Sequence, residues 1–245
     1  MRFVDLFDGI FIVNLPHRLD RRNEMEEQLQ RVGWQDHPAV QFFPAIRPQD
    51  AGEFPNIGAR GCFSSHLAIL ADAAHKGRRR ILILEDDLDF SHDFLLRTAA
   101  MTDRLQQDDW GIFYGGYEWP DELKQGLAGE GGVVRPVDPQ AGLRTTHFIA
   151  FQAPAIARVA DYLQAMLARP GGHPDGGPMH VDGAYSWFRR QNPDVLTLVA
   201  VPELGYQRSS RTDIHPPGWI DRLPLLSSLV AGLRRLKNRM RGAGR

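Results

Sequence analysis

Residues 81–87 read Ile-Leu-Ile-Leu-Glu-Asp-Asp and decide the fold. Their first half is an uninterrupted apolar run, which is typical of a strand buried on both faces of a parallel sheet. Helical patterns flank this run at 67–74 and 91–105, and an alternation of strands and helices favours a mostly parallel sheet. The three acids, called the acidic triplet below, follow the strand at the edge where open α/β sheets bind ligands. The stretch therefore predicts both an α/β fold and the place of its site.

The same patterns continue on both sides of residues 81–87. Short β-branched or aromatic runs predict further strands, and apolar residues at helical spacing predict helices. We expect strands at 9–15, 40–43, 110–114, 146–151 and 195–201, and helices at 21–32, 67–74, 91–105, 154–167 and 183–190. Gly115-Gly116 is expected to end the strand before it, and residues 58–65 to form a loop in front of the helix at 67–74.

Size and charge divide the chain into a domain and a tail. A chain of 245 residues with 42% hydrophobic residues can bury the core of one large α/β domain, which we assign to residues 1–221. Residues 222–245 hold seven Lys and Arg and no acid, and without them 22 basic residues face 30 acidic ones. Leucines at every third or fourth position predict a basic amphipathic tail there. It either docks on an anionic inner membrane or packs on the core ahead of a basic tip.

Cysteine usage and the N-terminal residues favour a cytoplasmic protein. Cys62 is the single cysteine, so no intramolecular disulfide asks for an oxidising compartment. The first eight residues carry acids where a signal peptide needs a basic start and a long apolar run, and no stretch approaches the length of a membrane span. We expect any membrane contact to be peripheral, at the inner membrane.

The acidic triplet is compatible with several kinds of site. Four carboxylates within residues 85–89 repel one another unless cations or hydrogen-bond donors compensate them. Hard cations such as Mg²⁺ and Mn²⁺ prefer carboxylate oxygens and leave room for phosphate oxygens, which favours sugar transfer from a nucleotide diphosphate. The alternatives are a solvated turn, the acidic pocket of a signalling receiver domain, and an aspartyl phosphatase with Asp87 and Asp89. Nucleic-acid binding is disfavoured because the body of the chain is acidic.

Five motifs in one order resemble a known family. They are Phe11–Arg22, Gly58–Leu67, Ile81–Asp87, Val181–Tyr185 and Pro202–Ile214, and together they extend over residues 9 to 214. The set resembles glycosyltransferase family 25, which includes lipopolysaccharide and lipooligosaccharide galactosyltransferases and collagen hydroxylysine galactosyltransferases. This resemblance implies a single type-A glycosyltransferase domain, which is Rossmann-like with a mostly parallel central sheet, and an inverting mechanism.

The resemblance also implies roles for the triplet. It makes residues 85–87 the counterpart of the family's Asp-x-Asp element, with Asp87 as a ligand of Mn²⁺ or Mg²⁺. Glu85 or Asp86 would contact the donor ribose or complete the metal's ligands. Thr212 stands where the family usually has a serine, and residues 147–152 lack its usual tyrosine and serine. The acceptor side is therefore expected to differ from that of the family.

Donor-binding residues are expected at the ends of the first strands. In type-A enzymes the donor lies there, which implies that Asn14 and Leu15 border the nucleotide and that Arg18, Arg21 and Arg22 neutralise phosphate. The alternative for the arginines is a solvated helix face that pairs with nearby glutamates.

Two further donor contacts are expected where the loop at 58–65 enters its helix. Ser65 and His66 would lie there, and the free amides and positive dipole end of a helix suit a diphosphate. His66 is alternatively a structural histidine, and Cys62 is interpreted as buried filler rather than as a nucleophile.

Inversion needs a base on the acceptor side. We expect Asp182 to be this base, because it follows a Gly/Pro-rich loop that is suited to act as a lid and begins a short helix. The alternative role for Asp182 is helix capping. Asp213, or alternatively His215, is predicted to give a further metal or diphosphate contact.

The sequence thus predicts a metal-dependent inverting glycosyltransferase. It would move a hexose, with galactose from UDP-galactose as the first candidate, to a saccharide or lipid-linked glycan acceptor such as a lipopolysaccharide core. The competing hypothesis is a non-catalytic protein that binds nucleotide sugars or acts as a scaffold at the membrane.

Overall fold

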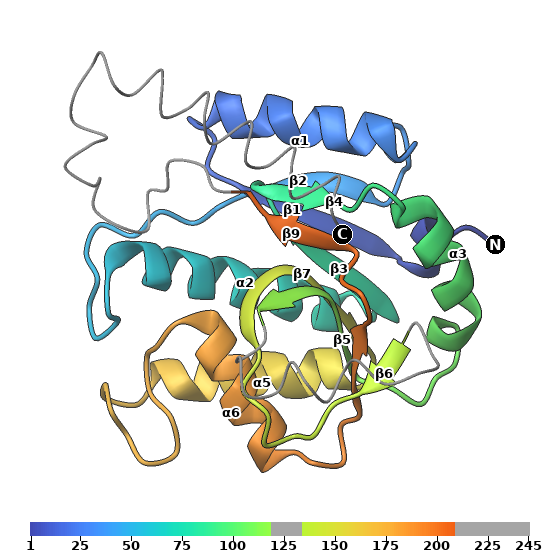
Figure 1. The fold of residues 1–245 in the computed structure, drawn as a ribbon. Helices are drawn as coiled ribbons and strands as arrows, with labels where there is room; N and C mark the ends of the chain where they lie inside the picture. Colours follow the sequence, from blue (N-terminus) through green and yellow to red (C-terminus); the bar gives the residue numbers. More distant parts are fainter. Residues whose placement is uncertain (119–133, 209–245) are drawn as a thin grey trace.

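The computed structural model describes residues 1–118 and 134–208. In this part of the chain, seven strands form a central sheet with the order β2-β1-β3-β7-β5-β8-β6, and two short strands, β4 and β9, form a ribbon beside it (Figure 1). The strands of the central sheet are β1 (Gly9–Asn14), β2 (Val40–Pro44), β3 (Arg80–Glu85), β5 (Ile112–Glu118), β6 (Val134–Pro136), β7 (Arg144–Gln152) and β8 (Thr197–Ala200). The ribbon pairs β4 (Leu88–Phe90) with β9 (Gly205–Gln207) in antiparallel register.

The central sheet is mostly parallel, as the sequence predicts. Strand β1 pairs in parallel with β2 and β3, and β5 pairs in parallel with β8. Strand β7 runs antiparallel to both β3 and β5, and β6 runs antiparallel to β8. Five of the seven strands therefore point one way. The carboxyl ends of β1, β2 and β3 meet at one edge, where Val13 is in register with Glu85 and Asn14 with Pro44.

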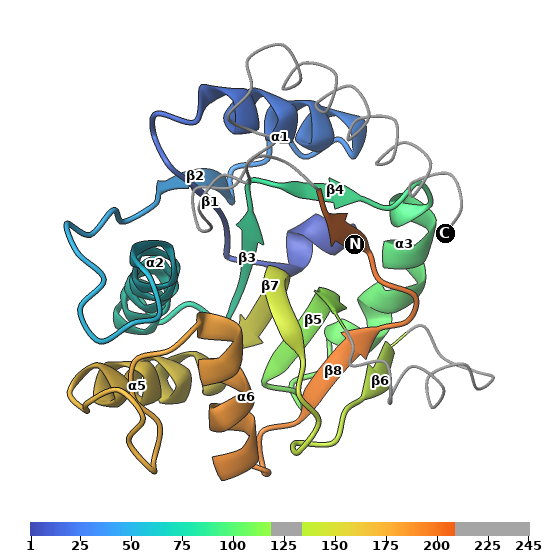
Figure 2. The same cartoon turned by 60° about the vertical axis from the view of Figure 1, so that its left-hand side comes forward.

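Helices cover both faces of the sheet (Figure 2). One face carries α2 (Ile57–His75), α5 (Ala155–Leu167) and α6 (Val181–Gln191), and the other carries the 3₁₀ helix η1 (Phe3–Leu6), α1 (Leu19–Arg31) and α3 (Phe94–Leu105). Alternate residues of β3 serve the two faces, since Ile81 and Ile83 belong to the first core and Leu82 and Leu84 to the second. Burial on both faces explains why this strand is apolar throughout.

Helix α2 begins earlier than the sequence predicts. It starts at Ile57 rather than at Leu67, and the side chain of Asn56 caps it by accepting a hydrogen bond from the amide of Ala59. Residues 58–65 are therefore helical, and the expectation of a loop there is wrong. A close approach explains the glycine in this segment, because a Cβ at Gly61 would lie 2.7 Å from the carbonyl oxygen of Ile46.

Strand β5 continues through Gly115-Gly116, so the prediction that these glycines end it is also wrong. A side chain at either position would collide with β7, since a Cβ at Gly115 would lie 2.1 Å from the ring of Phe148 and one at Gly116 would lie 2.2 Å from His147. The glycines let two strands pack closely, with register shifts at this point.

No helix of residues 1–118 and 134–208 has the length and apolar character needed to cross a membrane. The tail predicted for 222–245, the boundary at 221, and Asp213 and His215 lie outside the described residues.

Candidate functional site at the carboxyl edge of the parallel strands

A cavity of about 340 Å³ lies at the edge where β1, β2 and β3 end. Five segments line it: the end of β1 with the turn that follows, the start of α1, the residues after β2, the first turns of α2, and the acidic triplet. The lining residues are Val13, Leu15, His17, Arg18, Arg21, Ala45, Ile46, Arg47, Pro48, Ile57, Gly58, Gly61, Cys62, Ser65, Glu85, Asp86 and Asp87. The cavity therefore stands where parallel α/β sheets bind ligands.

The acidic triplet forms one wall of this cavity. Asp86 and Asp87 are buried, and Arg21 of α1 contacts both, with its Nη1 2.8 Å from Asp86 and 3.2 Å from Asp87. Asn14 donates a second hydrogen bond to Asp86, at 2.8 Å. Glu85 accepts a hydrogen bond of 2.7 Å from the hydroxyl of Thr146 on β7.

Carboxyl groups outnumber the cations in contact with them at this wall. Burial and the neighbouring carboxylate of Asp87 raise the pKa of Glu85 to about 8, although the Thr146 hydroxyl lowers it. Burial also raises the pKa of Asp87, against the opposing effect of the Arg21 guanidinium. One guanidinium in direct contact does not balance three carboxylates, so the wall is suited to a further cation. Its oxygen ligands match the preference of Mn²⁺ and Mg²⁺.

The other walls carry positive groups. Arg18 and Arg47 line the cavity together with Arg21, and Arg47 is exposed at the rim. Ile57 and Gly58, the first residues of α2, lie beside them, so the amino end of a helix opens into the cavity. A helix start and arginines together favour an anion such as a diphosphate. Carboxylates on one side and cations on the other are what a metal-bound diphosphate requires.

The structure brings most of the sequence-predicted residues to this cavity. Leu15, Arg18, Ser65 and the acidic triplet line it. The hydroxyl of Ser65 is engaged within the protein, since it accepts from the amide of Ile46 and donates to the carbonyl of Gly61. Asn14 lies behind the wall, where it holds Asp86.

Besides Asn14 and His66, two predicted residues lie outside the lining, Arg22 and Asp182. The guanidinium of Arg22 pairs with Glu26 and lies over the ring of Phe42. Asp182 is in the first turn of α6, where its carboxylate accepts hydrogen bonds from the amides of Thr145 and Gly183. The first of these contacts holds Thr145, which has a left-handed φ of 64° that is uncommon for a residue other than glycine.

Cys62 lines the cavity, whereas His66, on the same helix, does not. His66 is fully buried, its Nδ1 is 2.9 Å from the hydroxyl of Tyr185, and burial lowers its pKa to about 4. Cys62 stands one helical turn before it and faces the cavity, and burial raises the pKa of its thiol.

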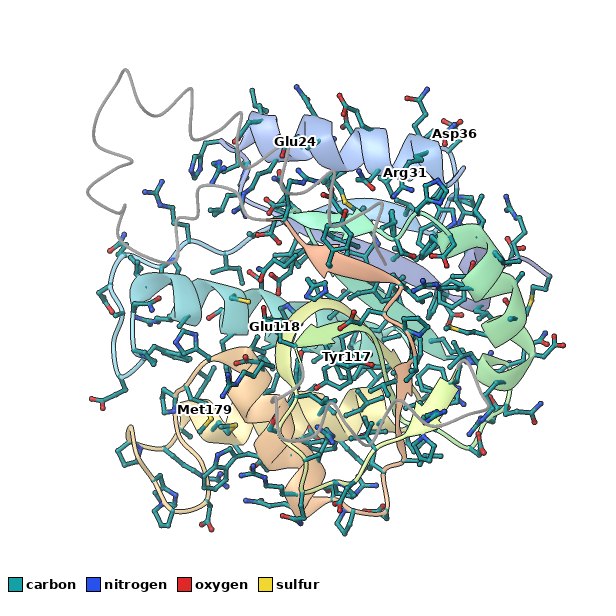
Figure 3. The ribbon with its side chains drawn as sticks, in the orientation of Figure 1. Glu24, Arg31, Asp36, Tyr117, Glu118 and Met179 are labelled. Carbon is teal, nitrogen blue, oxygen red and sulfur yellow. The ribbon has the colours of Figure 1, made fainter. Side chains whose placement is uncertain are left out.

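Residues to which the sequence assigned no individual role complete the site. Gln207 at the end of β9 donates weakly to both Glu85 and Asp87, at 3.5 and 3.4 Å. Arg208 fixes this strand by pairing with Asp89 and with Glu24 of α1, which is labelled in Figure 3. Its backbone amide also donates to the carbonyl of Asp87, at 2.7 Å. Pairing between β4 and β9 joins positions about 120 residues apart, which no local pattern predicts.

Comparison with known proteins first defines the class by fold. A solved structure described as a glycosyltransferase involved in the glycosylation of the major capsid of PBCV-1 is similar over 83% of this chain and 93% of that one, with a TM-score of 0.51 and 12% identity. At that identity the likeness shows the fold, which is that of type-A glycosyltransferases.

The sequence adds a match to a family over part of the chain. Residues 7–121 match the family described as "Glycosyltransferase family 25 (LPS biosynthesis protein)". Human procollagen galactosyltransferase 2 is 28% identical over 127 residues, which cover 44% of this chain and 20% of that protein. The human inactive glycosyltransferase 25 family member 3 is 26% identical over a stretch of the same length, 21% of its own chain. These matches confirm the resemblance to glycosyltransferase family 25 over residues 7–121.

The relatives also limit the conclusions that the match supports. The chain spans about a fifth of the length of these curated relatives. One of the two is named as inactive. The motifs at 181–185 and 202–214 lie outside the matched residues 7–121. Activity therefore has to be argued from the site itself.

Proposed function

We propose that this chain is a metal-dependent inverting glycosyltransferase that moves a hexose from a nucleoside diphosphate sugar to a saccharide acceptor. The observation that carries the proposal is the two-sided cavity, with the acidic triplet on one wall and Arg18, Arg47 and the start of α2 on the others. The name of the human relative, procollagen galactosyltransferase 2, supports UDP-galactose as the first donor to test. The family description, LPS biosynthesis protein, supports a lipopolysaccharide core as the acceptor.

Mn²⁺ or Mg²⁺ would be held by Asp87, with Glu85 or Asp86 completing its ligands or contacting the ribose. When bound, the metal would neutralise charge that develops on the departing diphosphate. Asp213 remains a predicted further contact outside the described residues. Arg18 and Arg47 would hold the phosphate oxygens by charge-assisted hydrogen bonds. The apolar Val13, Leu15 and Ile46 would cover the nucleoside.

In the transfer step the acceptor hydroxyl oxygen attacks the anomeric carbon as the bond to the diphosphate breaks, and a base takes the hydroxyl proton. Asp182 remains the proposed base. Its two contacts with backbone amides leave lone pairs on its carboxylate oxygens. Its charge contributes to the raised pKa of Cys62, which lines the cavity.

The decisive experiment is a panel of UDP-sugars incubated with the protein, Mn²⁺ and lipopolysaccharide-core acceptors. We expect release of UDP, by transfer or slow hydrolysis, that requires Mn²⁺ and is fastest with one hexose donor. Absence of turnover with every donor would favour the competing hypothesis, a binding or scaffold protein. A relative that is named as inactive supports keeping this hypothesis. Binding of UDP without turnover would identify that second function.

Peripheral contact with an anionic inner membrane is a separate proposal. It rests on the basic, leucine-spaced pattern of residues 222–245. Deletion after Leu223 should abolish binding to anionic liposomes and leave transfer to a soluble acceptor intact. Liposome binding that is unchanged by the deletion would refute it.

A further inference from the structure

A second group of ligand atoms lies next to the cavity and includes the first residue of the acidic triplet. Cys62 and His66 stand one turn apart on α2, and Glu85 ends the neighbouring strand β3. One sulfur, one ring nitrogen and one carboxylate oxygen from these residues lie within 4.8 Å of one another. In tetrahedral zinc sites, bonds of about 2.0–2.3 Å place ligand atoms roughly 3.3–3.8 Å apart. Small side-chain rotations would close the difference.

The state of His66 fits a metal ligand. Its Nδ1 is 2.9 Å from the hydroxyl of Tyr185, whereas its buried Nε2 has no hydrogen-bond partner within the described part of the chain. A ring nitrogen without a partner in a fully buried side chain is costly. Histidines that bind metals commonly donate their other ring N–H to an oxygen, which fixes the tautomer and the ring orientation. The Tyr185 hydroxyl oxygen would accept that hydrogen bond, leaving Nε2 to bind the cation.

Glu85 has matching support. Its carboxylate accepts a hydrogen bond from Thr146 at 2.7 Å, which orients it in the way that ligating carboxylates are usually held. Glu85 and Cys62 both line the cavity, so a cation bound to them would keep a coordination position open toward it. Three protein ligands with one open position is the arrangement of exchangeable or reactive zinc sites.

We propose that Cys62, His66 and Glu85 form a second cation site, selective for thiophilic divalent ions such as Zn²⁺. A thiolate and an imidazole select such ions, whereas Mn²⁺ and Mg²⁺ favour oxygen ligands. The Cys62 thiol, and the Glu85 carboxyl where it is protonated, lose their protons to solvent on binding, and the resulting thiolate and carboxylate balance the charge of Zn²⁺. The site is distinct from the group formed by Asp86, Asp87 and Arg21, although Glu85 adjoins both.

The test uses Co²⁺ as a spectroscopic substitute for Zn²⁺, with the full chain freed of metal by a chelator. We expect a thiolate-to-cobalt charge-transfer band in the near ultraviolet that saturates at one equivalent and is lost when Zn²⁺ is added. Because Cys62 is the single cysteine of the chain, no other residue can give this band. A titration without it would overturn the proposal.

Variants separate this site from general metal binding. Cys62→Ser should lose the band entirely. Tyr185→Phe keeps the ring in the core and removes only the hydroxyl that holds His66, so it should weaken Co²⁺ binding by about 10- to 100-fold. His66→Gln should weaken it at least as much. Unchanged affinity in both Tyr185→Phe and folded His66→Gln, as judged by circular dichroism, would contradict the assignment.

Asp87→Asn is the matched acidic control, since Asp87 is not one of the three proposed ligands. Its Co²⁺ band should still appear and saturate at one equivalent, while UDP binding with Mn²⁺ is lost. A band that disappears in Asp87→Asn would place the thiophilic ion at the acidic triplet instead and overturn the separate site. Sugar transfer is not measured, so failure of the proposed function would leave this result standing.

Discussion

The two halves of the central sheet use buried charge in different ways. The mixed half is formed by β7, β5, β8 and β6, whose strands run in both directions. Beside it, the fully buried Arg189 of α6 donates to the carbonyls of Ala141 and Asp138 and to the hydroxyl of Thr197, at 2.9–3.2 Å. In the parallel half, formed by β2, β1 and β3, Arg21 contacts Asp86 and Asp87, and this one guanidinium does not compensate the three carboxyl groups of the acidic triplet. The first arrangement is complete without a ligand, and the second is not. Burial of a charge therefore does not mark a site, whereas an excess of one sign beside a cavity does.

The largest expected effect is the loss of sugar transfer in Asp182→Asn, which tests whether a residue beside the mixed half takes part in catalysis. If Asp182 is the base, Asp182→Asn should lower the rate of transfer by about 10²- to 10⁴-fold while the affinity for UDP stays the same. Rates with the best donor and calorimetric UDP titrations check this. Retained turnover together with a loss of about 1 kcal/mol in the free energy of unfolding would make Asp182 purely structural, holding Thr145 and Gly183.

Arg189→Met tests the self-contained character of the mixed half. It leaves two buried carbonyls and a hydroxyl without their donor, so the free energy of unfolding should fall by about 3 kcal/mol. Urea denaturation measures the loss, and transfer well below the melting temperature should persist. The exposed neighbour Arg190 is the control, since Arg190→Ala should change stability by no more than about 0.5 kcal/mol. Equal losses in both variants would argue against the contacts of Arg189 as the cause.

His147 gives the same half a dependence of stability on pH. Burial lowers its pKa from 6.5 to about 4, so below pH 6.5 the unfolded chain binds a proton that the folded chain does not. The free energy of unfolding is therefore expected to fall as pH drops from 6.5 toward 4, by up to about 1.4 kcal/mol per pH unit from this residue. Urea denaturation between pH 7 and 4.5 should give a shallower slope for His147→Gln. An identical slope would show that His147 is not responsible.

The smallest effects concern the cationic walls of the cavity. Arg47 lies at the rim and Arg22 does not line the cavity, so Arg47→Ala should weaken UDP binding by about tenfold and Arg22→Ala by no more than about twofold. Calorimetry on the two variants is a matched comparison, because each loses one exposed arginine. Equal weakening would mean that overall charge, rather than the position of Arg47, attracts the donor.

The sequence predicts the parallel half of the fold well, because its signals are local. The apolar runs of β1 and β3 predict strands because both are buried on both faces of the sheet. The abrupt change from apolar residues to acids predicts where β3 ends. Glycines misled the prediction in two places. In α2 and in β5, Gly61, Gly115 and Gly116 allow close packing instead of breaking an element. Whether a glycine breaks or packs depends on neighbours far along the chain.

The residues of the candidate site were predictable mainly where they border the early strands, with Ser65 of α2 as the exception. Leu15, Arg18 and the acidic triplet were found because strand ends converge in any parallel sheet. Thr146 and Gln207 were not, since their contacts with Glu85 depend on how β7 and β9 return to this edge. The pairing of Arg22 with Glu26 is the solvated-face alternative that helical spacing offers, and local spacing alone does not choose between it and a phosphate contact.

Calorimetric titration of UDP, with and without Mn²⁺, tests the central claim that the triplet and the cationic walls form one metal and diphosphate site. We predict that UDP binds the unchanged protein tightly only with Mn²⁺, and that Asp87→Asn abolishes this gain. Asp103→Asn, at an exposed position of α3, should retain it. Affinity for UDP that is the same with and without Mn²⁺, or a gain that persists in Asp87→Asn, would contradict the account.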